Sequence, residues 1–175
     1  MSASILVIST SLSSSSNSRK LAQRAAALLG DCQFIDLRDY PLPLCGADSS
    51  FGDENARKLA GMITAAQCVL LAVPIYNYDV SAAAKNLIEL SGKAWLGKIV
   101  GFMCAAGGKS SYMSVMGVAN SLMLDFRCLV IPRFVYADGT SFDEASITDA
   151  DVEKRLSGLL DDAKKLTRAL APVST

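Results

Sequence analysis

Short runs of uninterrupted apolar residues recur along this chain, with longer amphipathic segments between them. Four clear runs cover residues 5–8, 68–73, 99–103 and 128–131, and a weaker one covers 33–37. A strand that is apolar on both faces belongs to a sheet that is covered on both sides, which is typical of parallel sheets. The pattern therefore predicts buried parallel strands rather than the alternating strands of an open antiparallel sheet.

The amphipathic segments carry the three-and-four spacing of helices. They cover residues 18–29, a stretch around Leu59, and residues 82–90, 111–124 and 152–170. Gly30 is a stop signal for the first of them. Ser50 or Asp53 can cap the second, and Ser81 can cap the third. Repeated β-α alternation predicts one α/β domain over residues 1–175, a five-stranded parallel sheet with helices on both faces.

The charge balance and one missing residue type exclude several functions. The 17 Lys and Arg residues equal the 17 Asp and Glu residues, so the chain lacks the basic footprint of a nucleic-acid binder or a polybasic membrane module. It contains no histidine, which excludes His-ligated zinc, His-based triads and imidazole proton shuttles. Any chemistry must use hydroxyls, amides, thiols, carboxylates or a cofactor.

The cysteines indicate a reducing compartment. Their number, five, is odd, and no two of them form a CxxC pair. Cys68, Cys104 and Cys128 lie in or beside apolar runs, where a free thiol packs as a small hydrophobe. This usage predicts structural thiols in the cytoplasm.

Two segments resemble membrane or export signals only at first sight. Residues 59–78 carry no charge and are long enough for a membrane helix, but Pro74 and Asn77 interrupt them. We interpret this stretch as a helix end followed by a buried strand. The first residues have no basic region and only a four-residue apolar run, which does not match a signal peptide.

The loop after the first predicted strand consists almost entirely of short polar residues. Nine of the ten residues from 9 to 18 are Ser, Thr or Asn, and the segment leads directly into a helix. Free N–H groups at a helix N-terminus, together with hydroxyl donors, suit a phosphate. The alternative is a flexible serine linker. The loop has no Gly, which excludes a Walker A loop and a dinucleotide fingerprint but not a site for a terminal monophosphate.

Two further loops follow the third and fourth predicted strands. Residues 74–79 combine a proline, an asparagine and two tyrosines, a stiff turn that can hold a planar heteroaromatic ring by its polar edge. Residues 105–111 contain paired glycines, which permit close approach of the backbone to a ligand or a positive φ. An ordinary surface turn is the alternative for each loop alone. Parallel α/β sheets bind ligands beyond the carboxyl ends of their strands, so we expect the three loops to share one ligand.

Short motifs in these loops match those of a known family. The first motif is matched at Ser11, Leu12, Ser16, Ser18 and Leu21. The second, P-x-Y-N followed by K-N, is matched at Pro74, Tyr76, Asn77, Lys85 and Asn86, and a Gly-Gly loop at Gly107 and Gly108. Over about residues 3–137 the chain resembles the NAD(P)H-dependent FMN reductases of the flavodoxin-like superfamily. The resemblance implies a flavodoxin-like three-layer sandwich with strand order 2-1-3-4-5.

The resemblance also implies a set of FMN-binding residues. The phosphate would be held by Ser11, Ser13, Ser16, Asn17 and Ser18. The isoalloxazine would contact Pro74, Ile75, Tyr76, Asn77 and Tyr78, with Asn77 and backbone amides at its polar edge. Ala106, Gly107 and Gly108 would close the far side. Two positions depart from the family pattern. Ser13 stands where Arg is usual, which removes a cation from the phosphate end, and Ile75 stands where Glu is frequent, which makes the ring environment more apolar.

The implied function is electron transfer through FMN. NADH or NADPH would supply a hydride, and a quinone, azo compound, metal oxyanion or free flavin would take the electrons with ping-pong kinetics. Neither a nucleic acid nor a membrane is expected as a partner, and no protein acid or base is required. A flavodoxin-type electron carrier without a nicotinamide site is the first alternative, although such carriers are usually strongly acidic. A flavodoxin-like binding module that has lost its cofactor is the second.

The family also implies a homodimer or homotetramer. Met113, Met116 and Met123 are candidates for an interface. Because they form no clean helical stripe, core packing is the expected role of each.

Overall fold

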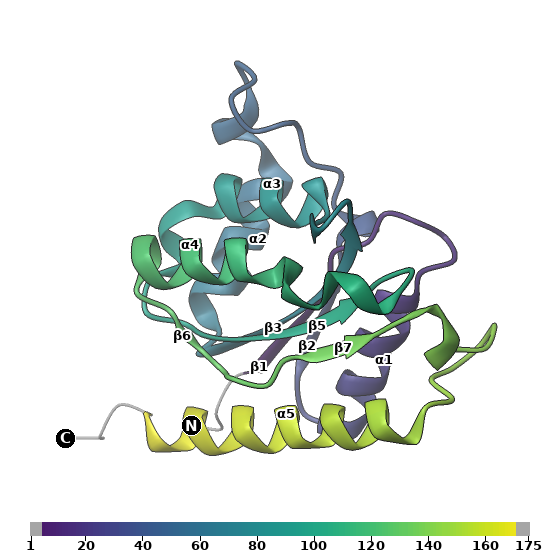
Figure 1. Cartoon of the computed structure of the whole chain (residues 1–175). Coiled ribbons are helices and arrows are strands. Elements are labelled where there is room, and N and C mark those ends of the chain that lie inside the picture. Colours follow the sequence, from purple (N-terminus) through teal and green to yellow (C-terminus); the bar gives the residue numbers. More distant parts are fainter. Residues whose placement is uncertain (1–4, 171–175) are drawn as a thin grey trace.

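Strands and helices alternate through residues 5–170, the range that the computed structural model describes; the ends of the predicted domain, residues 1–4 and 171–175, lie outside it (Figure 1). The strands are β1 (Ile5–Ser9), β2 (Gln33–Asp36), β3 (Cys68–Tyr76), β4 (Asp79–Val80), β5 (Ile99–Ala105), β6 (Leu129–Val130) and β7 (Val135–Ala137). The α-helices are α1 (Asn17–Leu29), α2 (Glu54–Ala65), α3 (Ala82–Ser91), α4 (Met116–Phe126) and α5 (Ala150–Ala169).

The sheet has the predicted strand order. Its strands follow the path β2-β1-β3-β5-β6, all parallel, and β7 pairs with the far end of β5. Counting β6 and β7 as the fifth predicted strand, this is the expected order 2-1-3-4-5. The sheet has seven strands rather than five because the fifth strand is divided and a short antiparallel strand, β4, pairs with the end of β3.

Helices cover both faces of the sheet, as Figure 1 shows, with α2, α3 and α4 on one face and α1 and α5 on the other. The first layer buries Leu59, Leu87 and Leu122 against the sheet. The second buries Leu21 and Leu156. The central strands are buried on both faces for this reason, and their continuous apolar runs follow from it.

The predicted helix boundaries agree with the caps. Gly30 ends α1 with φ of 72°, a conformation that glycine adopts without strain. Asp53 rather than Ser50 caps α2, because its side chain accepts a hydrogen bond from the N–H of Ala56. Ser81 caps α3 in the same way.

The fifth strand differs from the prediction of one run over 128–131. β6 ends at Val130, and pairing with β5 resumes only at Val135. Pro132 has no N–H to donate to a neighbouring strand, and Arg133 has a left-handed φ of 62°. The chain therefore leaves the sheet between β6 and β7.

The fourth helix also differs, since α4 begins at Met116 rather than near Ser111. Residues Lys109–Val115 form a 3-10 segment with a kink at Ser111. The carbonyls of Gly108 and Ser110 accept hydrogen bonds from the hydroxyls of Tyr136 and Tyr78. These tyrosines compete for carbonyls that an α-helix would use at its start, which explains the tighter and irregular first turns.

The methionines of this region do not pack in the core as predicted. Met113, Met116 and Met123 are 59%, 43% and 39% exposed, and Leu124 beside them is 77% exposed. An apolar strip therefore lies on the outer surface of α4 and of the 3-10 segment before it.

The prediction for the uncharged stretch is confirmed. Residues 59–65 end α2, and β3 begins at Cys68. None of the described helices combines the length and apolar character that crossing a membrane requires. Cys68, Cys104 and Cys128 are buried as expected.

Candidate functional site

Three loops meet at the carboxyl edge of the sheet. Thr10, directly after β1, donates from its N–H to the carbonyl of Ala72 in β3 over 3.0 Å. In register, Pro74 of β3 lies beside Ala105 of β5, and the N–H of Ala106 donates to the carbonyl of Ala137 in β7. The loops after β1, β3 and β5 are therefore neighbours, as the sequence predicts for a shared ligand.

The serine loop, residues 10–18, is folded back on itself. Ser11, Ser16 and Ser18 are buried, whereas Ser13 is exposed and Asn17 half-buried. The hydroxyl of Ser16 caps α1 by accepting the N–H of Arg19, and it lies 3.0 Å from the hydroxyl of Ser18. One of these two hydroxyls donates its proton to the oxygen of the other, so the second O–H remains free to donate to another acceptor.

Arg19 lies directly behind the serine loop and is only 6% exposed. Its guanidinium donates to the carbonyls of Ser13 at 2.7 Å and Ser14 at 3.0 Å, and reaches that of Ser11 at 3.5 Å. Its Nε donates to Asp36 at the end of β2, 2.8 Å away. A buried cation thus fixes the direction of three backbone carbonyls in the loop.

The direction of these carbonyls decides where the loop N–H groups point. In a trans peptide the carbonyl and the next N–H point in opposite directions. Because the carbonyls of residues 11, 13 and 14 face Arg19, the N–H groups of Leu12, Ser14 and Ser15 face away from it. Within the described residues 5–170, no acceptor is recorded for these three N–H groups. A cluster of unpaired N–H donors backed by a positive charge and a helix N-terminus suits a phosphate dianion.

Asp36 holds two arginines and remains ionised. Its carboxylate accepts hydrogen bonds from Arg19 and, at 2.7 Å, from Nη2 of Arg38. Burial alone would raise the pKa of Asp36, but the hydrogen bonds from Arg38 and the charges of both arginines hold that pKa below its usual value. The group of two arginines and one aspartate therefore keeps a net positive charge behind the serine loop. This positive charge lies at the phosphate end of the site, where Ser13 replaces the arginine that is usual in the family.

The second loop is a tight hairpin turn rather than an open loop. β3 continues through Pro74 and Ile75 to Tyr76, and residues 75–76 pair with β4. Asn77 and Tyr78 connect the two strands with φ of 50° and 67°. Positive φ at both central residues is the geometry of a type I′ hairpin, and it is unfavourable for a tyrosine. Backbone strain at a residue as large as Tyr78 is typical of functional sites.

The turn presents flat aromatic surface to solvent. Tyr76 is 56% exposed and Tyr78 is 59% exposed, whereas Pro74 and Ile75 are buried beneath them. The hydroxyl of Tyr78 donates to the carbonyl of Ser110, which joins the second loop to the third. An exposed aromatic platform beside a row of backbone amides can stack a planar ring.

The third loop leaves room beside its backbone. Gly107 and Gly108 are exposed, and a Cβ at either position would meet no atom within 4 Å. The sequence predicts either a positive φ or close approach of the backbone to a ligand at these glycines. Neither glycine has a positive φ, so close approach of the backbone is the role that remains. Ala106 is buried and its N–H is already bonded to Ala137.

These features fit FMN in both parts of that molecule. The phosphate would meet the N–H groups of Leu12, Ser14 and Ser15 and the hydroxyls of Ser11, Ser16 or Ser18. The ring would lie against the turn at residues 76–78 and the open backbone of residues 107–108. Three of the predicted ring-contact residues, Pro74, Ile75 and Ala106, are buried and support their loops rather than offer exposed surface.

Comparison with known proteins decides the family. The family model of the NADPH-dependent FMN reductases matches residues 3–143. The chain belongs to the NADPH-dependent FMN reductase family. It is therefore an NAD(P)H-dependent flavoenzyme with FMN as its cofactor, and the flavodoxin-type carrier is not favoured.

Curated relatives of this FMN reductase carry related activities in their names. An NAD(P)H-dependent FAD/FMN reductase of Geobacillus thermodenitrificans is 30% identical over 132 residues, which cover 74% of this chain and 71% of that protein. An NADPH azoreductase of a Bacillus species is 27% identical over 146 residues, covering 79% and 82%.

Solved structures show the same fold. The flavoenzyme NAD(P)H:(acceptor) oxidoreductase of Paracoccus denitrificans superposes with a TM-score of 0.78 at 21% identity, covering 95% of this chain and 97% of that one. An apo NADH:FMN oxidoreductase superposes with a TM-score of 0.76 at 20% identity, covering 93% and 89%. At identities this low, the comparison shows that the flavodoxin-like fold is shared and shows nothing beyond the fold.

Sequence reasoning missed three residues of this site. Arg19 follows the serine loop by one position, and its role depends on where Asp36, 17 residues later, arrives in space. The signal that was available is an arginine in the first turn of a helix, where a cation opposes the helix dipole and therefore needs another reason to be there. Arg38 has no local signal at all.

Proposed function

We propose that this FMN reductase holds the FMN phosphate on the serine loop, through Ser11, Ser13, Ser16, Asn17 and Ser18 and the loop N–H groups. The isoalloxazine then lies against residues 74–78, with residues 106–108 closing the far side. The observation that carries the proposal is the group of unpaired N–H donors at Leu12, Ser14 and Ser15, held outward by Arg19. FMN supplies the redox chemistry, taking a hydride from NAD(P)H and passing two electrons on.

The chain's own residues bind and orient. The serine loop fixes one end of the cofactor. The turn at residues 76–78, which we call the aromatic turn, limits where the ring of the cofactor can lie. Backbone N–H groups at Gly107 and Gly108 can donate to the polar edge of the ring and stabilise negative charge there. No residue of the site is needed as a proton donor, which suits a chain without histidine.

The acceptor is a small molecule that replaces the nicotinamide on the same face, with ping-pong kinetics. Quinones, azo compounds, metal oxyanions and free flavin are the proposed classes. The names of two relatives, an FAD/FMN reductase and an azoreductase, support free flavin and azo compounds among these classes. We place the enzyme in the cytoplasm because its five thiols are free. A homodimer or homotetramer is supported by the exposed apolar strip around Met113 and Met116.

Two measurements test this proposal. Because charged hydrogen bonds contribute about 1.5–3 kcal/mol each, FMN should bind at least about 100-fold more tightly than riboflavin, which lacks the phosphate. Equal affinities would remove the phosphate from the serine loop. Initial rates with NADPH and a naphthoquinone should give parallel double-reciprocal lines, whereas intersecting lines would contradict ping-pong exchange on one face.

A further inference from the structure

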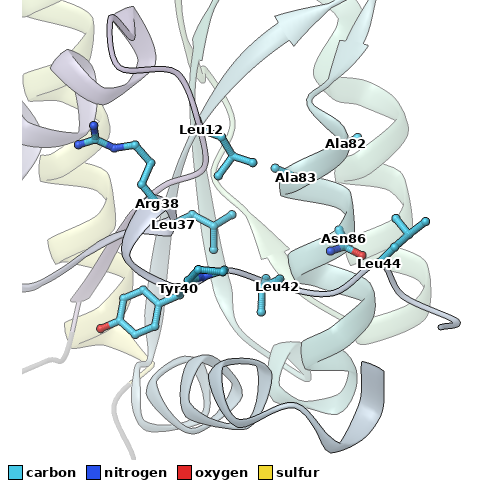
Figure 2. Close-up of a pocket in the computed structure, with 10 residues that line it drawn as sticks. Leu12, Leu37, Arg38, Tyr40, Leu42, Leu44, Ala82, Ala83 and Asn86 are labelled. Atoms are coloured by element: carbon cyan, nitrogen blue, oxygen red, sulfur yellow. The ribbon is translucent and has the colours of Figure 1, made fainter. Parts of the chain in front are cut away.

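An apolar pocket of about 570 Å³ lies beside the candidate flavin site (Figure 2). We call it the leucine pocket. It lies between the serine loop, the segment after β2 and the start of α3, and its main apolar walls are Leu12, Leu37, Leu42, Leu44 and Ala83. Its volume falls within the range of small-molecule sites.

The leucine pocket adjoins the flavin site at both ends. Leu12 belongs to the serine loop and follows Ser11 directly. At the other end, the N–H of Ser81, one residue before α3, donates to the carbonyl of Pro74 over 3.1 Å. The wall formed by the first turn of α3 therefore starts where the aromatic turn ends. A molecule in the pocket would lie alongside a flavin that spans these two loops.

The outer wall of the pocket is held in place. Asn86 of α3 accepts the N–H of Cys45 at 2.8 Å and donates to the carbonyl of Pro43 at 2.9 Å. Two prolines, Pro41 and Pro43, restrict the same segment. The pocket is therefore pre-formed, and a ligand does not have to order this wall on binding.

Two polar side chains at the pocket, Asn86 and Arg38, are held by other groups of the protein. Both ends of the Asn86 amide bond the backbone of the wall, and the Nε and Nη2 of Arg38 bond Asp36. Figure 2 shows the guanidinium of Arg38 and the hydroxyl of Tyr40 directed away from the space between Leu12, Ala83 and Leu42. A ligand with polar edges, such as an adenine, a free flavin or a metal oxyanion, would lose water there without gaining partners.

We propose that the leucine pocket binds the hydrocarbon substituent of an aromatic electron acceptor, a quinone with an alkyl or prenyl chain. This inference rests on the proposed function and selects among its acceptor classes. In the overall reaction NAD(P)H is oxidised to NAD(P)⁺, and the quinone takes up that hydride and one proton from solvent to become the hydroquinone. The pocket holds the acceptor's apolar side while its ring exchanges electrons at the flavin.

The first test is a series of 2-alkyl-1,4-naphthoquinones of increasing chain length. For the native enzyme, kcat/KM should rise by about three- to fourfold for each methylene that the pocket buries. Ferricyanide, a small hydrophilic acceptor, is the internal control for flavin reduction. A series without any rise in kcat/KM would overturn the inference.

Two variants locate the effect. Ala83→Trp fills the pocket from a half-buried position and should lower kcat/KM for the longest quinone by about tenfold or more while the ferricyanide rate stays within about twofold. Leu44→Ser removes apolar surface at a position that is 73% exposed, so folding is not at risk, and should cost about fivefold. Leu96→Ser, 53% exposed in the segment before β5, is the matched control and should change neither rate. An equal loss with ferricyanide would contradict the pocket.

A binding measurement separates this inference from the proposed function. Calorimetric titration with 2-naphthol, an aromatic that accepts no electrons, should show binding to the native protein and at least fivefold weaker binding to Ala83→Trp. Equal binding would overturn the pocket. Binding that is lost in Ala83→Trp, together with FMN that NADPH fails to reduce, would contradict the proposed function alone. If Ala83→Trp instead alters the sedimentation coefficient while kcat/KM still rises with the chain length of the quinone, the pocket is an interface between copies of the chain. The inference then fails.

Discussion

Arg19 is a buried cation whose guanidinium donates to three backbone carbonyls of the serine loop and to Asp36. Removing a charge of this kind has two separable consequences. The loop carbonyls lose their common donor, so the N–H groups on the other side of each peptide lose their shared direction. Asp36 also keeps only one of its two arginines.

Replacement of Arg19 should therefore weaken the binding of phosphate more than the binding of a ring. Arg19→Leu is expected to raise the dissociation constant of FMN by about 10- to 100-fold, the equivalent of one lost charged hydrogen bond. The dissociation constant of riboflavin should change by less than about threefold. Both are measured by quenching of flavin fluorescence.

Two further variants make this result specific. Arg24→Leu removes an arginine whose side chain is 47% exposed and pairs with Glu153, and it should leave both constants unchanged. Arg19→Lys keeps the charge but not the fork of donors, and should give an intermediate FMN affinity. A parallel loss of FMN and riboflavin affinity would show that Arg19 acts on the fold and not on the loop.

The carboxylate of Asp36 should make a pH-dependent contribution to stability. Because its pKa in the folded protein lies below the unfolded value of about 3.9, the contribution is complete above about pH 5 and is lost as pH falls through the folded pKa. Asp36→Asn should lower the free energy of unfolding by about 3 kcal/mol at pH 7, since it leaves a buried arginine without its anion. Urea unfolding from pH 7 to 3 should show this difference narrowing only below about pH 4. A difference that narrows between pH 7 and 5 would contradict the assignment.

At the scale of elements, the departures from prediction lie where single residues override a pattern. Periodicity places α1, α3 and α5 within about two residues of their ends, because caps such as Ser81 and Gly30 are readable from local chemistry. The break in the fifth strand depends on Arg133, and the hairpin depends on Tyr78; both adopt positive φ that their residue types disfavour. The hydroxyl of Tyr78 donates to the carbonyl of Ser110, 32 residues away in the chain, and a local sequence pattern does not reveal a contact of this kind.

Gly101 of β5 packs closely against Leu70 of β3 and Leu159 of α5. A Cβ there would lie 2.7 Å from Cδ2 of Leu70 and 3.1 Å from Cδ1 of Leu159. Gly101→Val should therefore lower the free energy of unfolding by about 1–3 kcal/mol through overpacking. Gly117→Ala is the matched control in α4, where a Cβ meets open space, and it should raise stability by about 0.5–1 kcal/mol. Denaturant melts of both variants check the pair, and a neutral Gly101→Val would contradict the close packing of α5 on the sheet.

For the whole molecule, the parallel sheet and the meeting of three loops follow from the sequence because buried parallel strands leave a continuous apolar signature. The strand order is predicted only from the family resemblance. The family motifs, which are local in the sequence, predict the proposed site at Ser11, Pro74 and Gly107. The long-range contacts that support the proposed site cannot be predicted from local sequence patterns. Asp36 and Arg19 are 17 residues apart, and Asn86 reaches the backbone 41 residues earlier. Contacts at these separations are set by packing of the whole sheet.

The two-sided core also predicts which thiols react. Burial raises the pKa of Cys68 and of Cys104 to about 12, and that of Cys128 to about 11. At pH 8 these three should be almost entirely protonated and shielded, and only the half-buried Cys32 and Cys45 can react with Ellman's reagent. Titration should give at most two thiols in the native protein and five in guanidinium chloride. A third fast thiol in the native protein would contradict the burial of this core.

We propose that the serine loop and the aromatic turn together form one FMN site, and a visible absorption spectrum of the protein checks this site directly. The protein as purified, or after addition of FMN and removal of the excess, should show the bands of bound flavin. Adding NADPH without oxygen should bleach these bands within seconds, and adding a naphthoquinone should restore them. A protein that stays colourless after incubation with FMN would contradict the proposed FMN site, and bound FMN that NADPH leaves oxidised would contradict the proposed reaction.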